Sequence, residues 1–144
     1  MSNITYVKGD LFELAPKGAY LAHACNCQGV WGSGIAVEFR KRFPDEYKDY
    51  VDLSLTYDEF LVGKFKDFGQ VVCLFTSYDY GQNKDSVSNI LKNTESGLKM
   101  ISNTPIKELH MPKINSGLFG VPWEETEAIL KKFDGKLKFV VYEL

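Results

Sequence analysis

Arginine and cysteine are both scarce in this sequence, and each shortage excludes a class of protein. Only two of its basic residues are arginines, Arg40 and Arg42, and the formal net charge is -2. Such a chain has no general attraction for nucleic acid, so we expect no nucleic-acid partner. Any bound phosphate must be held mainly by groups other than arginine. Three cysteines, an odd number, favour reduced thiols over a disulfide framework.

Long apolar runs are also missing, which excludes a transmembrane helix. The first residues, MSNITYVKGD, alternate like a strand and lack the basic start and apolar stretch of a secretory signal. A composition of 44% hydrophobic and 25% charged residues is typical of a folded protein. We therefore expect a cytoplasmic or nuclear protein without membrane association. A chain of 144 residues fits a single domain, residues 1–144, acting as a monomer.

The hydrophobic periodicity alternates between that of strands and that of helices along the chain. Ser33 is expected to cap the first long helix, and Pro122 to begin the last one. Strands are expected at 4–7, 20–25, 60–65, 71–76, 108–111 and 139–142, and helices at 33–43, 45–55, 85–101 and 122–133. This order favours a three-layer α/β/α sandwich with a mixed, mostly parallel central sheet.

Two glycine-rich loops each follow an apolar strand and precede a helix. The first loop is residues 27–34, CQGVWGSG, and the second loop is residues 113–122, KINSGLFGVP. In parallel sheets, ligands bind beyond the carboxyl ends of the strands. There, loop amides and a helix N-terminus can hold an anion without arginine. Each loop alone is equally well explained as an ordinary turn, but two loops at one edge favour a ligand cleft.

Several known phosphate motifs are absent. There is no glycine-flanked run ending in Gly-Lys-Ser/Thr, and Val37 stands where a dinucleotide fingerprint requires Gly or Ala. A cysteine phosphatase needs an arginine six positions after its cysteine. Trp31 and Ser33 stand at that distance from Cys25 and Cys27.

His23, Asn26 and Asn115 are the candidate catalytic residues. His23 ends an apolar strand, and an imidazole titrates near neutral pH, so it could assist a water molecule. The alternative, a histidine that only orients the loop, is equally compatible with the sequence. The two asparagine amides could orient water or stabilise phosphoryl oxygens, although asparagine is also a frequent turn residue.

A metal site is the alternative use of the same segment. His23, Cys25 and Cys27 share one side of an extended segment, and Cys73 or His110 could complete a set of four ligands. Cys-x-Cys is not the usual zinc spacing, and His110 lies in an apolar strand. We therefore expect no metal and no cofactor.

Four separated motifs carry a family resemblance: ITYVKGDLF, HACNCQGVWGSGIA, PKINSGLFGVPW and VVYEL. In their order and spacing the chain resembles a macro domain, an α/β module that binds ADP-ribose. INSG and GVPW in the second loop, with the CNC of the first motif, resemble the small fungal subclass that acts on ADP-ribose 1''-phosphate. The resemblance implies a small nucleotide ligand, ADP-ribose or its 1''-phosphate.

The resemblance also implies a role for each matching position. Asp10 would accept a hydrogen bond from the adenine amino group beside the amide of Leu11, and Tyr142 would flank the adenine. The distal ribose and its phosphate would lie against Asn26, Gly32, Ser33, Gly34 and Ile35. The diphosphate would lie on the second loop, against Asn115, Ser116, Gly117, Leu118, Phe119 and Gly120.

One departure from relatives bears on the reaction. Human relatives that remove ADP-ribose from glutamate esters use a lysine after the central strand and an aspartate in the second loop, where this chain has Ser77 and Phe119. We therefore expect hydrolysis of ADP-ribose 1''-phosphate with His23 assisting water. A binding module without activity, or a hydrolase of other ADP-ribose derivatives, remains the alternative.

Overall fold

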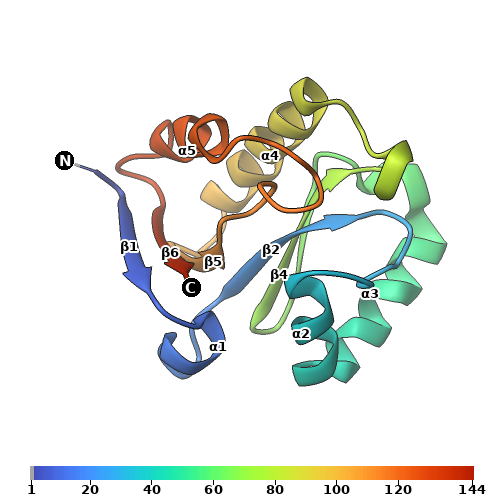
Figure 1. The fold of residues 1–144 in the computed structure, drawn as a ribbon, viewed down its shortest axis with the longest axis horizontal. Coiled ribbons are helices and arrows are strands. Elements are labelled where there is room, and N and C mark those ends of the chain that lie inside the picture. Colours follow the sequence, from blue (N-terminus) through green and yellow to red (C-terminus); the bar gives the residue numbers. More distant parts are fainter. Residues whose placement is uncertain (1) are drawn as a thin grey trace.

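The computed structural model describes residues 2–144, and six strands form one sheet at its centre (Figure 1). The strands are β1 (Ile4–Lys8), β2 (Leu21–Asn26), β3 (Phe65–Phe68), β4 (Val71–Ser77), β5 (Glu108–Pro112) and β6 (Lys138–Glu143). Their spatial order is β1-β6-β5-β2-β4-β3. All neighbours are parallel except β3 and β4, which form an antiparallel pair at one edge.

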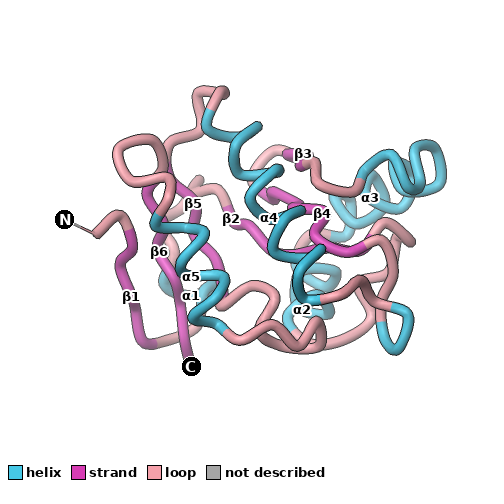
Figure 2. Tube along the Cα trace, turned by 90° about the horizontal axis from the view of Figure 1, so that it is seen from above, coloured by secondary structure: helices cyan, strands magenta, loops and turns pink. Residues whose placement is uncertain are grey.

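Helices cover both faces of the sheet, which confirms the expected three-layer α/β/α sandwich (Figures 1 and 2). The helices are α1 (Leu11–Leu14), α2 (Ile35–Arg42), α3 (Pro44–Tyr57), α4 (Val87–Ser102) and α5 (Trp123–Lys131), with short 3-10 helices η1 (Asp58–Leu61) and η2 (Gly81–Asn83). The residues of α4 and α5 pack on one face, and those of α1, α2 and α3 on the other. None of the helices in residues 2–144 combines the length and the apolar character needed to cross a bilayer.

The central strands β2 and β4 are buried on both faces, because their apolar residues alternate between the two layers. Ala22 and Leu74 pack toward α4 and α5, whereas Leu21, Cys73 and Phe75 pack toward α2 and α3. A continuous apolar run is what a strand between two helical layers requires. These buried strands hold the site loops at their carboxyl ends.

The expected strand at 60–65 is wrong. Residues 58–61 form η1, and β3 begins only at Phe65. Asp58 ends α3 with a positive φ of 47°, and the chain then turns back through Gly63, whose φ is +77°. Phe60 is consequently exposed on a turn, so its apolar character does not indicate a strand.

Two expected helix ends also differ from the structure. Gly34 and not Ser33 precedes α2, with φ 61° and ψ -143° and no side-chain cap. That conformation is open to glycine and strained for other residues. Pro122 lies just before α5, as its N-cap residue, and the helix ends at Lys131, so Phe133 packs into the core from a following turn.

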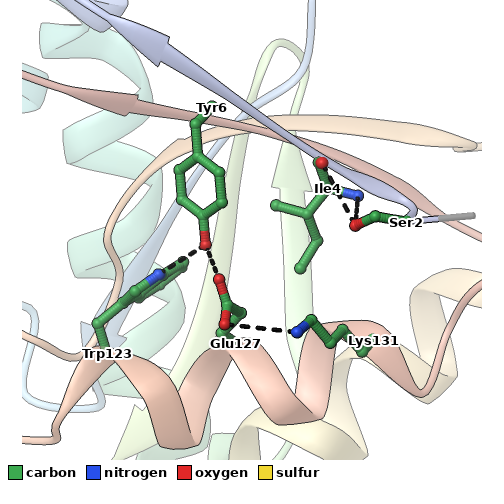
Figure 3. Close-up of polar contacts among 6 residues, drawn as sticks. All are labelled: Ser2, Ile4, Tyr6, Trp123, Glu127 and Lys131. Atoms are coloured by element: carbon green, nitrogen blue, oxygen red, sulfur yellow. Dashed lines mark hydrogen bonds and ion pairs between the residues drawn. The ribbon is translucent and has the colours of Figure 1, made fainter.

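The edge strand β1 is tied to α5 by a polar cluster (Figure 3). The Tyr6 hydroxyl donates to the carboxylate of Glu127 and accepts a hydrogen bond of 2.8 Å from Trp123 Nε1. Lys131 Nζ lies 3.6 Å from the same carboxylate. Desolvation and the bond to Glu127 raise the pKa of Tyr6 to about 12. The tyrosine therefore stays a neutral donor at physiological pH.

Gly97 sets how closely α4 approaches the sheet. A Cβ atom added at this position would lie 2.9 Å from Cδ2 of Leu74 and 3.3 Å from the backbone oxygen of Lys64. Leu74 is fully buried, so its side chain has little room to move. The glycine therefore permits a close contact between α4 and the sheet, and a larger residue at this position would push the two apart.

We expect Gly97→Ala to destabilise the protein by about 1 kcal/mol, because overpacking costs about 1–3 kcal/mol and exceeds the gain in helix propensity. Urea denaturation measures the change. Met100→Ala, on the same helix at a residue that is 41% exposed, is the control and should shift stability by less than about 0.5 kcal/mol. A Gly97→Ala protein as stable as the wild type would contradict the close approach.

Candidate functional site

Two adjoining cavities lie at the carboxyl ends of the parallel strands. The larger, about 600 Å³, is lined by the first loop, the second loop and a third loop, residues 78–86, that follows β4. The smaller, about 480 Å³, is lined by residues after β1, by the start of α2 and by the end of β6. Both cavities share walls at Gly34, Ile35, Pro112 and Lys113. The site is therefore two-lobed, with a junction between α2 and the second loop.

Asn26 organises the first loop. Its Oδ1 accepts from the amides of Gln28 at 3.0 Å and Val30 at 3.3 Å, and its Nδ2 donates to Val30 O at 2.8 Å. The hydroxyl of Tyr50 on α3 lies 2.9 Å from the same Oδ1. This side chain is 6% exposed, so its contacts favour a role in shaping the loop.

The amides beyond Asn26 are left free for a ligand. Within the part of the chain that the structure describes, the amides of residues 32–36 have no hydrogen-bond acceptor. Two of them, Ile35 and Ala36, belong to the first turn of α2, where the helix dipole adds partial positive charge. The first loop and α2 together thus present a set of donors suited to an anion.

Asn115 organises the second loop from inside the protein. It has a positive φ of 66°, which asparagine tolerates better than most residues. Its Oδ1 accepts from Thr76 at 3.0 Å, and its Nδ2 lies 3.0 Å from Thr94 Oγ1 and 3.5 Å from Thr126 Oγ1. The side chain thereby joins β4, α4 and α5. These contacts also favour a structural role, and catalysis by Asn115 stays a prediction.

The second loop then presents three consecutive free amides. Gly120 N donates to Gly117 O and Val121 N donates to Asn115 O, which closes the turn. Between them, the amides of Gly117, Leu118 and Phe119 find no acceptor anywhere in residues 2–144. All three residues line the larger cavity. Consecutive amides turned toward one space form an anion-binding concavity.

His23 lies at the wall of the larger cavity, in a cluster of aromatic rings. Its ring stacks on Phe39 with centroids 3.9 Å apart and meets Trp31 edge-on at 4.8 Å. The residue is 1% exposed, and the contacts of its ring nitrogens are to Cys25 Sγ, at 3.5 and 3.8 Å. This packing fixes Trp31 and the first loop, and a catalytic role for His23 stays a prediction.

The cysteines pack in the core. Burial raises the pKa of Cys27 to about 12 and that of Cys73 well above its usual value, so these thiols are neutral. Cys25, Cys73 and His23 do place their donor atoms within 4.8 Å of one another. Cys25 Sγ lies 3.8 Å from Nδ1 and 3.5 Å from Nε2 of His23. Within the described chain, these three side chains are the part of the alternative metal set whose donor atoms lie close enough together to share an ion.

The remaining candidates of the alternative metal set are separate from that cluster. Cys27 Sγ lies 3.8 Å from Ser77 O. His110 bonds Tyr142 Oη at 2.7 Å and Glu108 Oε2 at 2.9 Å. The histidine in β5 therefore orients the tyrosine that lines the smaller cavity.

The smaller cavity holds the predicted adenine-binding residues together. Asp10, Leu11 and Tyr142 all line it. Oδ1 of Asp10 accepts from Phe12 N at 2.8 Å, and its other carboxylate oxygen has no donor within the described residues. The amide of Leu11 is likewise without an acceptor there. Burial and nearby Glu108 raise the pKa of Tyr142, which keeps its hydroxyl neutral.

The structure brings almost all predicted site residues to one edge, but Gly120 is not among the residues that line either cavity. Sequence reasoning missed the third loop, which contributes Tyr80, Gly81, Gln82 and Lys84. The signal was available, because β4 is a buried strand parallel to β2 and its carboxyl end must reach the same edge. Ser77, at the end of β4, is buried and uses its hydroxyl within the third loop.

Curated proteins of similar sequence come from fungi. The chain is 41% identical to a protein of Meyerozyma guilliermondii over 92% of this chain and 94% of the relative. It is 37% identical to a protein of Saccharomyces cerevisiae over the whole of both chains, and 41% identical to one of Candida albicans over 96% and 98%. Each of these relatives bears the name ADP-ribose 1''-phosphate phosphatase.

Solved structures share the fold at lower identity. The macrodomain of Mycobacterium tuberculosis DarG superposes with a TM-score of 0.75 at 24% identity, covering 98% of this chain and 97% of that one. DarTG of Thermosipho africanus, solved in complex with ADP-ribose, gives 0.78 at 23% identity, covering 99% and 42%. Residues 22–130 match the macro domain family. This protein therefore belongs to the macro domain family.

Proposed function

We propose that this protein hydrolyses ADP-ribose 1''-phosphate to ADP-ribose and inorganic phosphate. The observation that carries the proposal is the two-lobed site, whose junction and larger lobe are lined by free backbone amides. Full-length similarity to curated fungal phosphatases of that substrate supports the same reaction. A single chain lines both lobes, so the proposed activity needs no second subunit.

The ligand is placed by matching its groups to the two lobes. The adenine occupies the smaller cavity, where the free oxygen of Asp10 accepts from its amino group and Tyr142 flanks the ring. The diphosphate lies on the amides of Gly117, Leu118 and Phe119. The distal ribose and its phosphate then fall in the larger cavity, against the amides of residues 32–36.

Backbone donors suit phosphoryl transfer, because the main task is to stabilise negative charge on the transferring group. No Asp or Glu side chain lines the larger cavity within the described chain, so a carboxylate base is not supplied there. In the proposed reaction, water attacks phosphorus, and the P–O bond to ribose breaks. His23, Asn26 and Asn115 contribute by holding the ligand-facing loops in shape. Direct catalysis by these residues stays a prediction.

The first test is phosphate release from ADP-ribose 1''-phosphate, with and without a chelator. We expect equal amounts of phosphate and ADP-ribose, unaffected by the chelator, because the site holds the substrate with backbone amides. Acetylated ADP-ribose is the comparison substrate and should turn over more slowly. If no phosphate is released while calorimetry still detects ADP-ribose binding, the protein is a binding module and the proposal fails.

Gly117→Ala tests the free amides of the second loop. A Cβ at this position meets no atom within 4 Å, so the fold should tolerate it. It would project into the space where the diphosphate approaches, and we expect the Kd for ADP-ribose to rise about tenfold, equivalent to about 1.4 kcal/mol. Calorimetry measures the affinity and thermal denaturation the stability. Thr5→Ala, on an exposed part of β1, is the control; equal affinities of the two variants would contradict this placement.

Two substitutions decide the role of His23. His23→Phe keeps a ring between Phe39 and Trp31, so we expect the fold and kcat to be retained within about threefold, with an unchanged pH profile between about pH 5.5 and 8.5. His23→Ala removes the ring and should destabilise the protein by about 2–4 kcal/mol. A folded His23→Phe protein that loses about 100-fold in kcat and the pH dependence near neutrality would instead establish proton transfer by His23.

A further inference from the structure

Lys84 is the lysine of the larger cavity whose ammonium group has no partner among the described contacts. It is half-buried in the third loop and lines the cavity. The other lysine of the cavity, Lys113, pairs with Glu143 at 2.7 Å. No carboxylate and no hydrogen-bond acceptor in residues 2–144 lies within bonding distance of the Lys84 ammonium group. A cation held near a cavity without a counter-charge is suited to an anionic ligand.

The backbone beside Lys84 is well anchored. Asp85 N donates to the Ser77 hydroxyl at 2.9 Å, and Tyr78 N donates to Asp85 Oδ2 at 3.2 Å. The amide of Cys27 in turn donates to Tyr78 O at 3.0 Å, which fixes the third loop against the first loop. The lysine therefore projects from a fixed backbone, and its ammonium group needs only rotamer changes to reach a ligand.

The position of Lys84 within the site indicates which part of a ligand it meets. The third loop lines the larger cavity but not the smaller one, and the two cavities join at Gly34, Ile35, Pro112 and Lys113. Cε of Lys84 lies 3.8 Å from where a Cβ of Gly120 would be, so the side chain lies against the second loop. A ligand whose adenine fills the smaller cavity extends its distal end into the larger cavity and toward the third loop.

We propose that Lys84 is the residue that recognises the terminal phosphate of the substrate and separates ADP-ribose 1''-phosphate from ADP-ribose. This inference rests on the proposed function and assigns a specificity-determining cation to it. The ammonium group donates to the non-bridging phosphate oxygens and balances their charge. Charge-assisted hydrogen bonds of this kind are the strong ones, and the product lacks the group that receives them.

The test compares turnover of the phosphorylated substrate with binding of the unphosphorylated product. We expect Lys84→Met to lower kcat/KM for ADP-ribose 1''-phosphate roughly 10- to 100-fold, the range for a lost hydrogen bond to a charged group. The Kd for ADP-ribose should change less than about twofold, because no phosphate contact is lost. Lys84→Arg keeps the charge and should recover activity to within about fivefold of the wild type.

Lys136→Met is the matched control, because Lys136 is exposed in the turn before β6, at the opposite edge of the sheet from the cavities. It removes the same charge and should behave as the wild type. Two results overturn the proposal. Either Lys84→Met turns over the substrate as fast as the wild type, or it weakens ADP-ribose binding as much as turnover, which would place Lys84 on the diphosphate.

Direct binding keeps this inference separable from the proposed activity. Calorimetry compares the affinities of ADP-ribose 1''-phosphate and ADP-ribose under conditions where turnover is too slow to matter. A wild-type protein that releases no phosphate but prefers the phosphorylated ligand, with the preference lost in Lys84→Met, would refute the activity and retain the recognition. A wild-type protein that releases phosphate, but whose preference for the phosphorylated ligand equals that of Lys84→Met, would retain the activity and refute the recognition by Lys84.

Discussion

Two buried asparagine side chains hold the ligand-facing loops in shape, and the rest of the site depends on them. Asn26 satisfies the turn amides directly after β2, and Asn115 connects the loop after β5 to three threonines on β4, α4 and α5. Asn26 thereby satisfies the amides of Gln28 and Val30, whereas Asn115 fixes its loop through the threonine hydroxyls. The amides of residues 32–36 and of Gly117, Leu118 and Phe119 then find no acceptor in residues 2–144. The site is thus built from donors that the fold itself does not use.

This construction accounts for a phosphate-binding cavity in a weakly acidic chain with two arginines. Main-chain amides are fixed by the sheet and carry only partial charge, so they are ready before the ligand arrives. The few full charges near the larger cavity are lysines, and one of them is already paired with Glu143. The aromatic cluster of His23, Trp31 and Phe39 then sets the shape of the wall beneath the first loop.

Much of this arrangement was predictable from sequence, because local patterns determine it. The apolar runs of β2 and β4 indicated a buried parallel sheet, and the rule that ligands bind at the carboxyl ends brought the first and second loops together. What the sequence could not supply depended on distant partners. The three threonines around Asn115 are separated from it by 11, 21 and 39 positions.

The strand expected at 60–65 was wrong because the apolar residues of a turn, exposed Phe60 and buried Leu61, imitate a strand. The third loop was missed because it lacks a glycine cluster, although its parent strand was identified. His23 illustrates the remaining ambiguity. The sequence places it at the end of a strand, whereas it lies inside β2, and its apolar surroundings in the sequence are the same whether its ring transfers a proton or stacks on Phe39.

The shared walls at Gly34, Ile35, Pro112 and Lys113 place the two cavities directly beside each other. In the proposed reaction the product keeps the adenine, both riboses and the diphosphate. It therefore keeps nearly all of the contacts with which the protein binds the substrate. Removing one phosphate does not by itself eject such a product. In the proposed reaction, the product ADP-ribose therefore competes with the substrate for the same two cavities, and only the contacts to the terminal phosphate favour the substrate.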